Sequence, residues 1–263
     1  MNRTLTSNFE FQHPRAKRST HFMNLALCAR WGVTLLGFFI AARLPADTVI
    51  FYPVADTTLF ETDPNNNFGA DSTLVAGTTA GSRGLALRSR ALIKFDPGSS
   101  IPTNAVISSA SLTVKVDANP TPSADSVFDV RRVLRSWNEG KKSGQRGAAA
   151  TSGETTWRAR FFGTTNLWAV PGGATNVDFS ATIGASTMVR GVGAYTFAST
   201  SNLVADVQSW LQDTNSNFGW IMMTESEGTP RTARRFYARE RKNTNDIPRL
   251  VVEFAVPTVT TPP

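Results

Sequence analysis

Cysteine and histidine are scarce in this sequence of 263 residues, which has one cysteine and two histidines. All three, Cys28, His13 and His21, lie among the first 46 residues. The other 217 residues therefore contain no thiol or imidazole. This excludes Ser-His-Asp and Cys-His catalysis, zinc sites built from these ligands, and disulfide bonds. We expect this part to be stabilised by hydrophobic burial within one large domain.

Residues 1–46 have the layout of a signal peptide. Basic residues precede an apolar run from Trp31 to Ala42, and small residues follow it. About a dozen apolar residues are too few to cross a bilayer, which takes roughly 20. We therefore predict a leader that is cleaved after Ala46 or, as the second choice, after Ala42; the alternative is an uncleaved membrane anchor. We expect a secreted or cell-surface bacterial protein with no membrane attachment after cleavage.

The net charge of +7 comes mostly from this leader. The leader holds 6 of the 27 basic and 1 of the 20 acidic residues, which leaves 21 basic and 19 acidic residues and a net charge of about +2. Domains that bind nucleic acids are usually strongly basic on one face. We therefore predict no nucleic-acid partner.

Alternation of apolar and polar residues dominates the chain after residue 46. Leu112, Val114 and Val116 alternate with Thr113 and Lys115, as in a strand with one buried face. Clusters of Gly, Pro, Asn and Asp separate several such segments. The pattern predicts an all-β fold, a jelly-roll-like antiparallel β-sandwich, over residues 47–256. Strands are expected at 48–52, 72–76, 90–95, 109–116, 126–134, 194–197, 218–224, 234–238 and 249–254.

Three kinds of segment depart from this alternation. Apolar residues recur at helical spacing over 203–211, which predicts one short helix capped by Ser201 or Asn202. Residues 140–153 and 167–193 have no clear period and are predicted to be surface loops. Residues 257–263 are rich in Pro and Thr and are predicted to form an extended tail. The sequence NNNFG at 65–69 returns as NSNFG at 215–219, which indicates shared turn chemistry or, alternatively, duplication.

A series of short motifs runs in order from residue 56 to residue 254. The motifs are DTTL (56–59), PNNNFG (64–69), LVAG (74–77), RALIKFD (90–96), IP (101–102), AVI (105–107), ASL (110–112), VLRSWNE (133–139), TTW (155–157), Asp206-Val207 with Trp210, RE (239–240) and PRL (248–250). The series resembles the DNRLRE domain, an extracellular bacterial and archaeal family classed with the alginate-binding carbohydrate-binding modules of family 96. The resemblance implies a jelly-roll sandwich in a secreted or surface protein that binds polysaccharide.

A module for an acidic polysaccharide such as alginate needs cationic side chains on an exposed strand face, and arginine meets a carboxylate bidentately. Three segments place such residues on one face by strand alternation. The alternative is an ordinary solvated face with charges of both signs. The predicted ligand-binding residues are Arg90 with Lys94, Arg131 with Arg135, and Arg235 with Tyr237 and Arg239.

Neutral sugars would instead require exposed aromatic platforms. We expect Trp137, Trp157 and Trp210 to pack in the core. Trp168 lies in a loop and is the best platform candidate. A calcium ion needs six to eight oxygen ligands, for which Asp56, Glu61 and Asp63 are candidates. The alternative is that the Asp and Asn residues near them cap turns.

We expect no enzymatic activity, because only carboxylate or tyrosine chemistry is left. A glycosidase would need two acids from among Glu139, Glu154 and Asp178. A lyase would use Tyr195 or Tyr237 as its base. A further alternative is an extracellular structural or adhesive matrix protein that joins other proteins in a larger assembly. That function predicts an exposed apolar patch or edge strand, whereas sugar binding predicts a cationic or aromatic groove.

Overall fold

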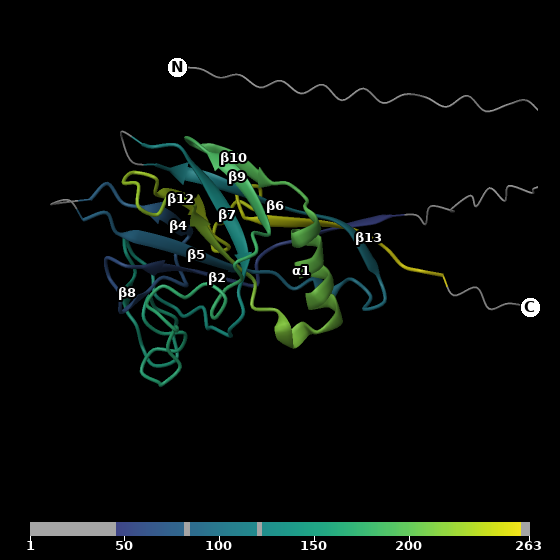
Figure 1. Ribbon diagram of the computed structural model, residues 1–263, viewed down its shortest axis with the longest axis horizontal. Coiled ribbons are helices and arrows are strands. Elements are labelled where there is room, and N and C mark those ends of the chain that lie inside the picture. The colour runs from purple at the N-terminus through teal and green to yellow at the C-terminus, as the bar shows by residue number, and fades with distance from the viewer. Residues whose placement is uncertain (1–45, 82–84, 120–122, 259–263) are drawn as a thin grey trace, which may run out of the picture. The chain divides into compact units, whose positions relative to one another are not determined.

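The computed structural model describes residues 46–81, 85–119 and 123–258, which form an antiparallel β-sandwich with one α-helix (Figure 1). This confirms the predicted fold class. The predicted leader lies outside the described residues except for Ala46, and the predicted tail lies outside them from residue 259 onward. None of the helices in the described ranges is long and apolar enough to cross a membrane.

Two β-layers pack face to face, and every pairing between their strands is antiparallel. Layer 1 contains β1 (Asp47–Phe51), β13 (Arg249–Ala255), β6 (Val106–Ala118), β10 (Gly193–Phe197) and β12 (Arg234–Tyr237). Layer 2 contains β2 (Ala55–Phe60), β5 (Arg88–Lys94), β11 (Trp220–Thr224), β7 (Ser126–Arg132) and β9 (Ala185–Val189). Two short strands, β3 (Asn66–Asn67) and β8 (Ala148–Ala149), pair apart from the layers.

Strand β4 (Thr73–Thr78) crosses from layer 1 to layer 2. It pairs with β12 up to Ala76 and with β5 from Gly77 onward. Gly77 has a φ of +104°, and a Cβ atom there would lie 2.7 Å from the carbonyl oxygen of Thr232. Only glycine combines this backbone conformation with so close an approach, so Gly77 permits the crossing.

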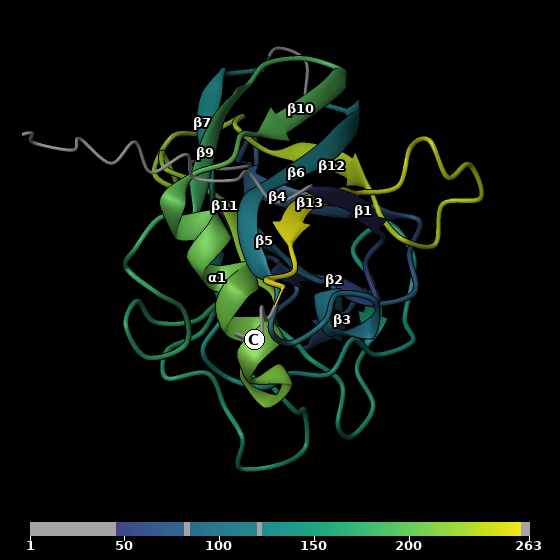
Figure 2. The ribbon, with the colours of Figure 1, turned by 90° about the vertical axis from the view of Figure 1, so that its right-hand side faces the viewer.

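The core lies between the two layers and is closed at one end by α1 (Ser201–Gln212). Figure 2 shows α1 packed at this end of the sandwich. Leu112, Val114 and Val116, predicted to face inward, are buried, and so is the predicted apolar face of the helix. The helix is capped by Thr200, whose hydroxyl accepts a hydrogen bond from the Leu203 amide at 3.0 Å. The predicted caps, Ser201 and Asn202, were wrong by one or two positions.

Residues 134–184, here called the loop layer, cover the outer face of layer 2. Trp157, Trp168 and Phe179 from this region form a second apolar cluster with residues of β5 and β11 such as Leu92 and Ile221. In Figure 1 the loop layer appears as teal and green loops beneath β2 and β5. Layer 1 instead carries exposed side chains on its outer face. This open face is therefore the place to look for a broad binding surface.

Each of the nine predicted strands overlaps an observed strand, but β2, β9 and the two-residue strands β3 and β8 were not predicted. Five of the six residues of β2 are buried, because the core covers one of its faces and the loop layer covers the other. Alternation therefore disappears there. Strand β9 and the short β8 lie within the two predicted loops, so those segments are not purely irregular.

The two Asn-Phe-Gly segments share turn chemistry, as the sequence indicated. The side-chain Oδ1 of Asn67 accepts from the Gly69 amide at 3.1 Å, and Oδ1 of Asn217 accepts from the Gly219 amide at the same distance. Each asparagine also donates to a distant backbone carbonyl. Asn67 reaches Glu139 at 2.6 Å, and Asn217 reaches Phe95 at 2.7 Å.

Candidate functional site

A polar groove of about 360 Å³ lies on the open face of layer 1. Outward residues of β4, β6 and β12 form its floor, because these strands are adjacent in layer 1. The turn at 144–145 forms a wall. A hydrogen bond from the Gly144 amide to the Asp71 carboxylate, at 3.1 Å, holds this turn in place. The lining residues are Phe68, Asp71, Ser72, Thr73, Val75, Asp117, Gly144, Gln145, Arg235 and Arg241.

An ionic network borders this groove around Tyr237. Arg235 pairs with Asp117, with Nη2 and Oδ2 2.6 Å apart. Lys115 and Arg241 share Asp246, at 2.5 and 3.5 Å. The cationic groups of Arg241 and Lys115 lie 4.5 and 5.8 Å from the centre of the Tyr237 ring. Two carboxylates and one aromatic ring thus hold three cations in fixed positions.

The two arginines of the groove retain donors for a ligand. The Arg235 side chain is 52% exposed, and Asp117 accepts from its Nε and Nη2 only. Arg241 is 41% exposed, and its buried Nε lies 3.5 Å from Asp246, so only its terminal nitrogens can reach a ligand. A guanidinium carries five N–H donors, so each arginine retains donors that Asp117 or Asp246 does not use. Asp71, in contrast, already accepts from Thr73 and Gly144.

Neither tyrosine considered as a lyase base is set up for proton abstraction. The Tyr237 hydroxyl hydrogen-bonds to Asp117, which raises the pKa of Tyr237 and favours the neutral phenol. The Tyr195 hydroxyl donates to the Gly191 carbonyl at 2.8 Å and accepts from the Arg190 amide at 3.1 Å. It therefore holds the connection between β9 and β10.

The three acids considered for a glycosidase also hold backbone in place. Glu154 accepts from the amides of Lys141 and Thr151, at 2.9 and 2.7 Å. Asp178 accepts from two amides of the loop layer, both at 2.8 Å. Glu139 accepts from the Asp56 amide at 2.7 Å. Each carboxylate therefore has a structural role in fixing a loop.

Arg90 was predicted to bind ligand, and the structure corrects this. The alternation was right, because Arg90 lies opposite the core face of β5, but the loop layer covers it and leaves it 6% exposed. Its Nε and Nη2 each donate to Glu227 at 2.7 Å, and its Nη1 donates to the carbonyls of Gly172 and Gly173. Arg90 therefore fastens the loop layer and cannot reach a ligand from outside.

The other predicted cations do not share one surface. Arg131 pairs with the buried Asp129 at 2.8 Å. Arg135 lies beyond the end of β7 in the loop layer, where its Nε donates to the Val177 carbonyl at 3.3 Å. Lys94 ends β5 and is half-buried. Only the β12 group, with Arg235 and Tyr237 outward, borders the groove, and there the predicted alternation is confirmed.

Trp168 is not an exposed platform, which corrects that prediction. It is 5% exposed, and its indole N–H donates to the Thr156 carbonyl at 2.9 Å. It packs in the second apolar cluster beside Trp157. Trp157 and Trp210 are buried as predicted, whereas Trp137 is only partly buried.

The predicted calcium ligands do not converge, so that prediction is also corrected. Asp56 is 1% exposed and accepts from the Arg239 amide at 2.9 Å. Glu61 forms an ion pair with Arg88 at 2.7 Å, and Asp63 pairs with Arg146 at 3.4 Å. Over the described ranges, no group of three or more acidic, His or Cys residues is placed to hold a metal ion.

Arg239, also predicted to bind ligand, belongs instead to an acidic cluster. Its Nε lies 2.6 Å from a Glu139 oxygen and 2.9 Å from a Glu240 oxygen. Asp56 is buried beside them, and burial together with the charge of Glu240 raises its pKa well above the ordinary value. Burial also raises the pKa of Glu240 to about 7. The Arg239 guanidinium thus pairs with two carboxylates, and a third, that of Asp56, is buried close by.

Sequence reasoning missed four residues of the groove network, namely Lys115, Asp117, Arg241 and Asp246. Lys115 was predicted to alternate with the buried residues of its strand, and Asp117 is the next residue of that face, but nothing in the sequence indicated that β12 would lie beside them. Arg241 follows β12 in a turn without periodicity, so no pattern indicated it. The cross-strand contacts that bring these residues together form only in the folded sheet.

Comparison with known proteins gives one family. A comparison with the curated proteins gives no match. Residues 47–144 match carbohydrate-binding module family 96, a stretch that runs from β1 through β7 into the loop layer. This match includes the β4 and β6 sides of the groove but not β12. Over residues 47–144 the chain is similar to carbohydrate-binding module family 96, which supports a carbohydrate-binding module.

Proposed function

We propose that the chain is a secreted, non-catalytic module that binds an acidic polysaccharide such as alginate in the groove of layer 1. The family similarity supports carbohydrate as the class of ligand. The signal-peptide layout of residues 1–46 supports export from a bacterial cell. The observation that carries the acidic preference is the pair of exposed guanidinium groups, Arg235 and Arg241, on one groove.

Carboxylates along a polysaccharide are planar acceptors that match a guanidinium fork. Asp117 holds Arg235 by one edge and leaves its other donors open. The hydroxyl-bearing residues Ser72 and Thr73 line the same groove and can hydrogen-bond sugar hydroxyls. The groove thus offers cationic and neutral polar contacts, as an acidic sugar chain requires.

The proposal is tested by affinity electrophoresis of the protein in gels containing alginate, pectin or a neutral glucan, at low and moderate salt, with and without calcium. We expect retardation by the acidic polymers that weakens as salt rises, because exposed charges are screened. The variants Arg235→Ala and Arg241→Ala are each expected to weaken binding about 10-fold or more, as for hydrogen bonds to charged groups. The matched control, Arg158→Ala, removes an exposed arginine of the loop layer and should leave binding unchanged.

Two results would contradict the proposal. If none of the polymers retards the protein, the proposed carbohydrate binding is refuted. Equal losses for the groove variants and for Arg158→Ala would place the acidic polymer elsewhere on the surface.

A second candidate function, assembly with other proteins, is favoured by strand β1. In the part of the chain that the structure describes, β1 is at the edge of layer 1 and pairs only with β13. Ile50, Tyr52 and Val54, on or just after this strand, are all exposed. Exposed edge strands with apolar side chains invite pairing with another chain. Sedimentation velocity of the wild type and Ile50→Lys tests this: a concentration-dependent oligomer that the variant abolishes would support assembly.

A further inference from the structure

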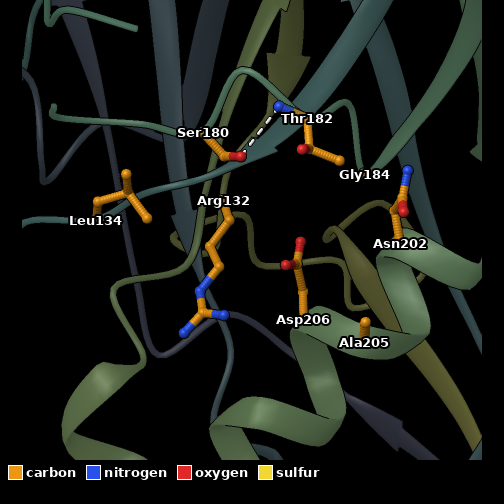
Figure 3. A pocket seen from close by; sticks show the side chains of 8 residues that line it. All are labelled: Arg132, Leu134, Ser180, Thr182, Gly184, Asn202, Ala205 and Asp206. Atoms are coloured by element: carbon orange, nitrogen blue, oxygen red, sulfur yellow. Dashed lines mark hydrogen bonds between the residues drawn. The ribbon is translucent and has the colours of Figure 1, made fainter. Parts of the chain in front are cut away.

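A second polar pocket, of about 240 Å³, lies at the end of β7 beside α1 (Figure 3). Three segments contribute to it: the end of β7 with Leu134, the turn at 180–184, and the first turns of α1. Several rim residues are exposed, so the pocket opens to solvent. The lining residues are Arg132, Leu134, Ser180, Thr182, Gly184, Asn202, Ala205 and Asp206.

Arg132 and Asp206 both reach into this pocket, from β7 and from α1 (Figure 3). Nη2 of Arg132 donates to the Ser216 hydroxyl at 3.2 Å, but its Nε is buried without a hydrogen-bond partner. One Asp206 oxygen accepts from the Trp220 indole at 2.8 Å. Among the described residues, no ion pair within 4 Å involves either side chain.

Two opposite charges in one pocket that do not pair directly select a particular kind of group between them. A carboxylate would be attracted by Arg132 but repelled by Asp206, and an ammonium group would meet the reverse. A hydroxyl can accept from the guanidinium and donate to the carboxylate at once. Burial raises the pKa of Asp206, and the nearby charge of Arg132 opposes this increase. The pocket is therefore suited to neutral groups that both donate and accept.

The remaining walls fit a sugar ring. Ser180, Thr182 and Asn202 add neutral hydrogen-bonding groups, and Leu134 adds an exposed apolar surface for the C–H face of a ring. Pockets for drug-sized ligands measure roughly 300–1,000 Å³. At about 240 Å³ this pocket has room for one ring, and any further rings of a chain would extend into solvent.

We propose that this pocket binds a single neutral sugar unit whose hydroxyl groups bridge Arg132 and Asp206. The site is distinct from the groove of layer 1, and the assignment of its ligand as a sugar rests on the proposed function. A module with both sites would hold an acidic chain on its open face and a neutral unit at the end of the sandwich.

The test uses ¹H–¹⁵N spectra of the protein titrated with methyl glucoside, galactoside and mannoside, and separately with glucuronate. The Trp220 indole N–H and the Arg132 Nε–H report on the pocket directly, because one hydrogen-bonds to Asp206 and the other lies unpartnered beside the cavity. The Trp168 indole, bonded within the loop layer, is the internal control. We expect at least one neutral glycoside to shift both pocket signals at concentrations up to roughly 50 mM, consistent with a millimolar Kd.

Arg132→Lys is expected to weaken this binding by at least about 10-fold, because it removes the planar donor set. Arg249→Lys, an exposed arginine on β13, is the matched control and should bind as the wild type does. Asp206→Asn keeps an acceptor for the Trp220 indole, so it should preserve the fold while reducing affinity. If these variants misfold, the wild-type titration still decides the question.

Three outcomes would overturn the proposal: no shift with any neutral glycoside, larger shifts with glucuronate than with the neutral sugars, or unchanged binding by Arg132→Lys. Failure of the two proposals can be told apart. If polysaccharide retardation fails while a neutral glycoside still titrates the pocket, only the groove is refuted. If Arg235→Ala abolishes retardation and the pocket signals never move, only the pocket is refuted.

Discussion

Arg90 fastens the loop layer to layer 2, and its replacement by methionine tests this role. In the wild type its guanidinium makes two hydrogen bonds to Glu227 and two to backbone carbonyls of the loop layer. It also lies 5.6 Å from the centre of the Trp157 ring and 5.5 Å from that of Phe179. Methionine keeps much of the apolar bulk but leaves Glu227 and both carbonyls without their donor.

The expected loss is large, because removing one partner of a buried ion pair costs about 3–5 kcal/mol. Glu227 is 20% exposed and keeps Arg88 3.8 Å away, so we expect Arg90→Met to lower the free energy of unfolding by about 3 kcal/mol, the lower end of this range. The double variant Arg90→Met/Glu227→Gln should recover part of this loss, since no unpaired charge then remains. Urea unfolding followed by tryptophan fluorescence measures both values.

Hydrogen exchange adds a local measurement. The amides that bond within the loop layer, such as Gly172 and Gly173, should lose protection in Arg90→Met before those of β6 do. Arg158→Met, at an exposed position of the same layer, should change stability by less than about 0.5 kcal/mol. An Arg90→Met protein as stable as the wild type, with weaker polysaccharide binding, would refute the structural role and restore Arg90 as a ligand residue.

Two further predictions concern the acidic cluster and the loop layer. The folded pKa of Glu240, about 7, exceeds its unfolded value near 4.5, so the folded state binds the extra proton and stability should fall by roughly 2–3 kcal/mol as pH rises from 4.5 through 7. Urea unfolding at pH 5 and 8 should show this fall in the wild type and a smaller fall in Glu240→Gln. If the free energy of unfolding falls equally in both proteins, Glu240 is not the group that causes it. Gly172→Ala should destabilise by about 2–4 kcal/mol, because φ is +87° and the new Cβ would lie 2.5 Å from the Trp157 ring. Gly153→Ala, at a φ of +89° with open space around it, is the strain-only control and should cost about 1–2 kcal/mol; equal losses would mean that the Trp157 contact does not matter.

Local patterns predicted most of the secondary structure because most strands bury only one face. In β6 and β12, apolar and polar side chains alternate, and the burial follows that alternation. The helix was found from the spacing of four apolar residues, all of which are buried. Strand β2 was missed because both of its faces are covered and it buries polar residues such as Thr57 and Thr58, so it shows neither alternation nor an apolar run. Strands β5 and β11 are also buried on both faces, but they contain the apolar runs ALI and WIMM, which indicated strands.

The candidate ligand residues show what local sequence patterns cannot predict. Alternation correctly placed Arg90 and Arg235 away from the core, but it cannot tell whether another layer covers that outer face. The loop layer covers Arg90, whereas Arg235 remains 52% exposed beside Asp117. Trp168 was proposed as a platform because it lies in a loop, yet that loop folds back to form part of the second apolar cluster.

The sequence by itself determined the fold class, the strands that bury one face, the helix, and the absence of thiol and imidazole chemistry after residue 46, because each follows from composition or from neighbours along the chain. Only the tertiary structure decided which cations remain accessible. It also decided which carboxylates neutralise them and where the groove and the second pocket lie. These features depend on contacts between residues far apart in sequence, such as Arg235 with Asp117 and Asp206 with Trp220, and no local period encodes which distant strand becomes a neighbour.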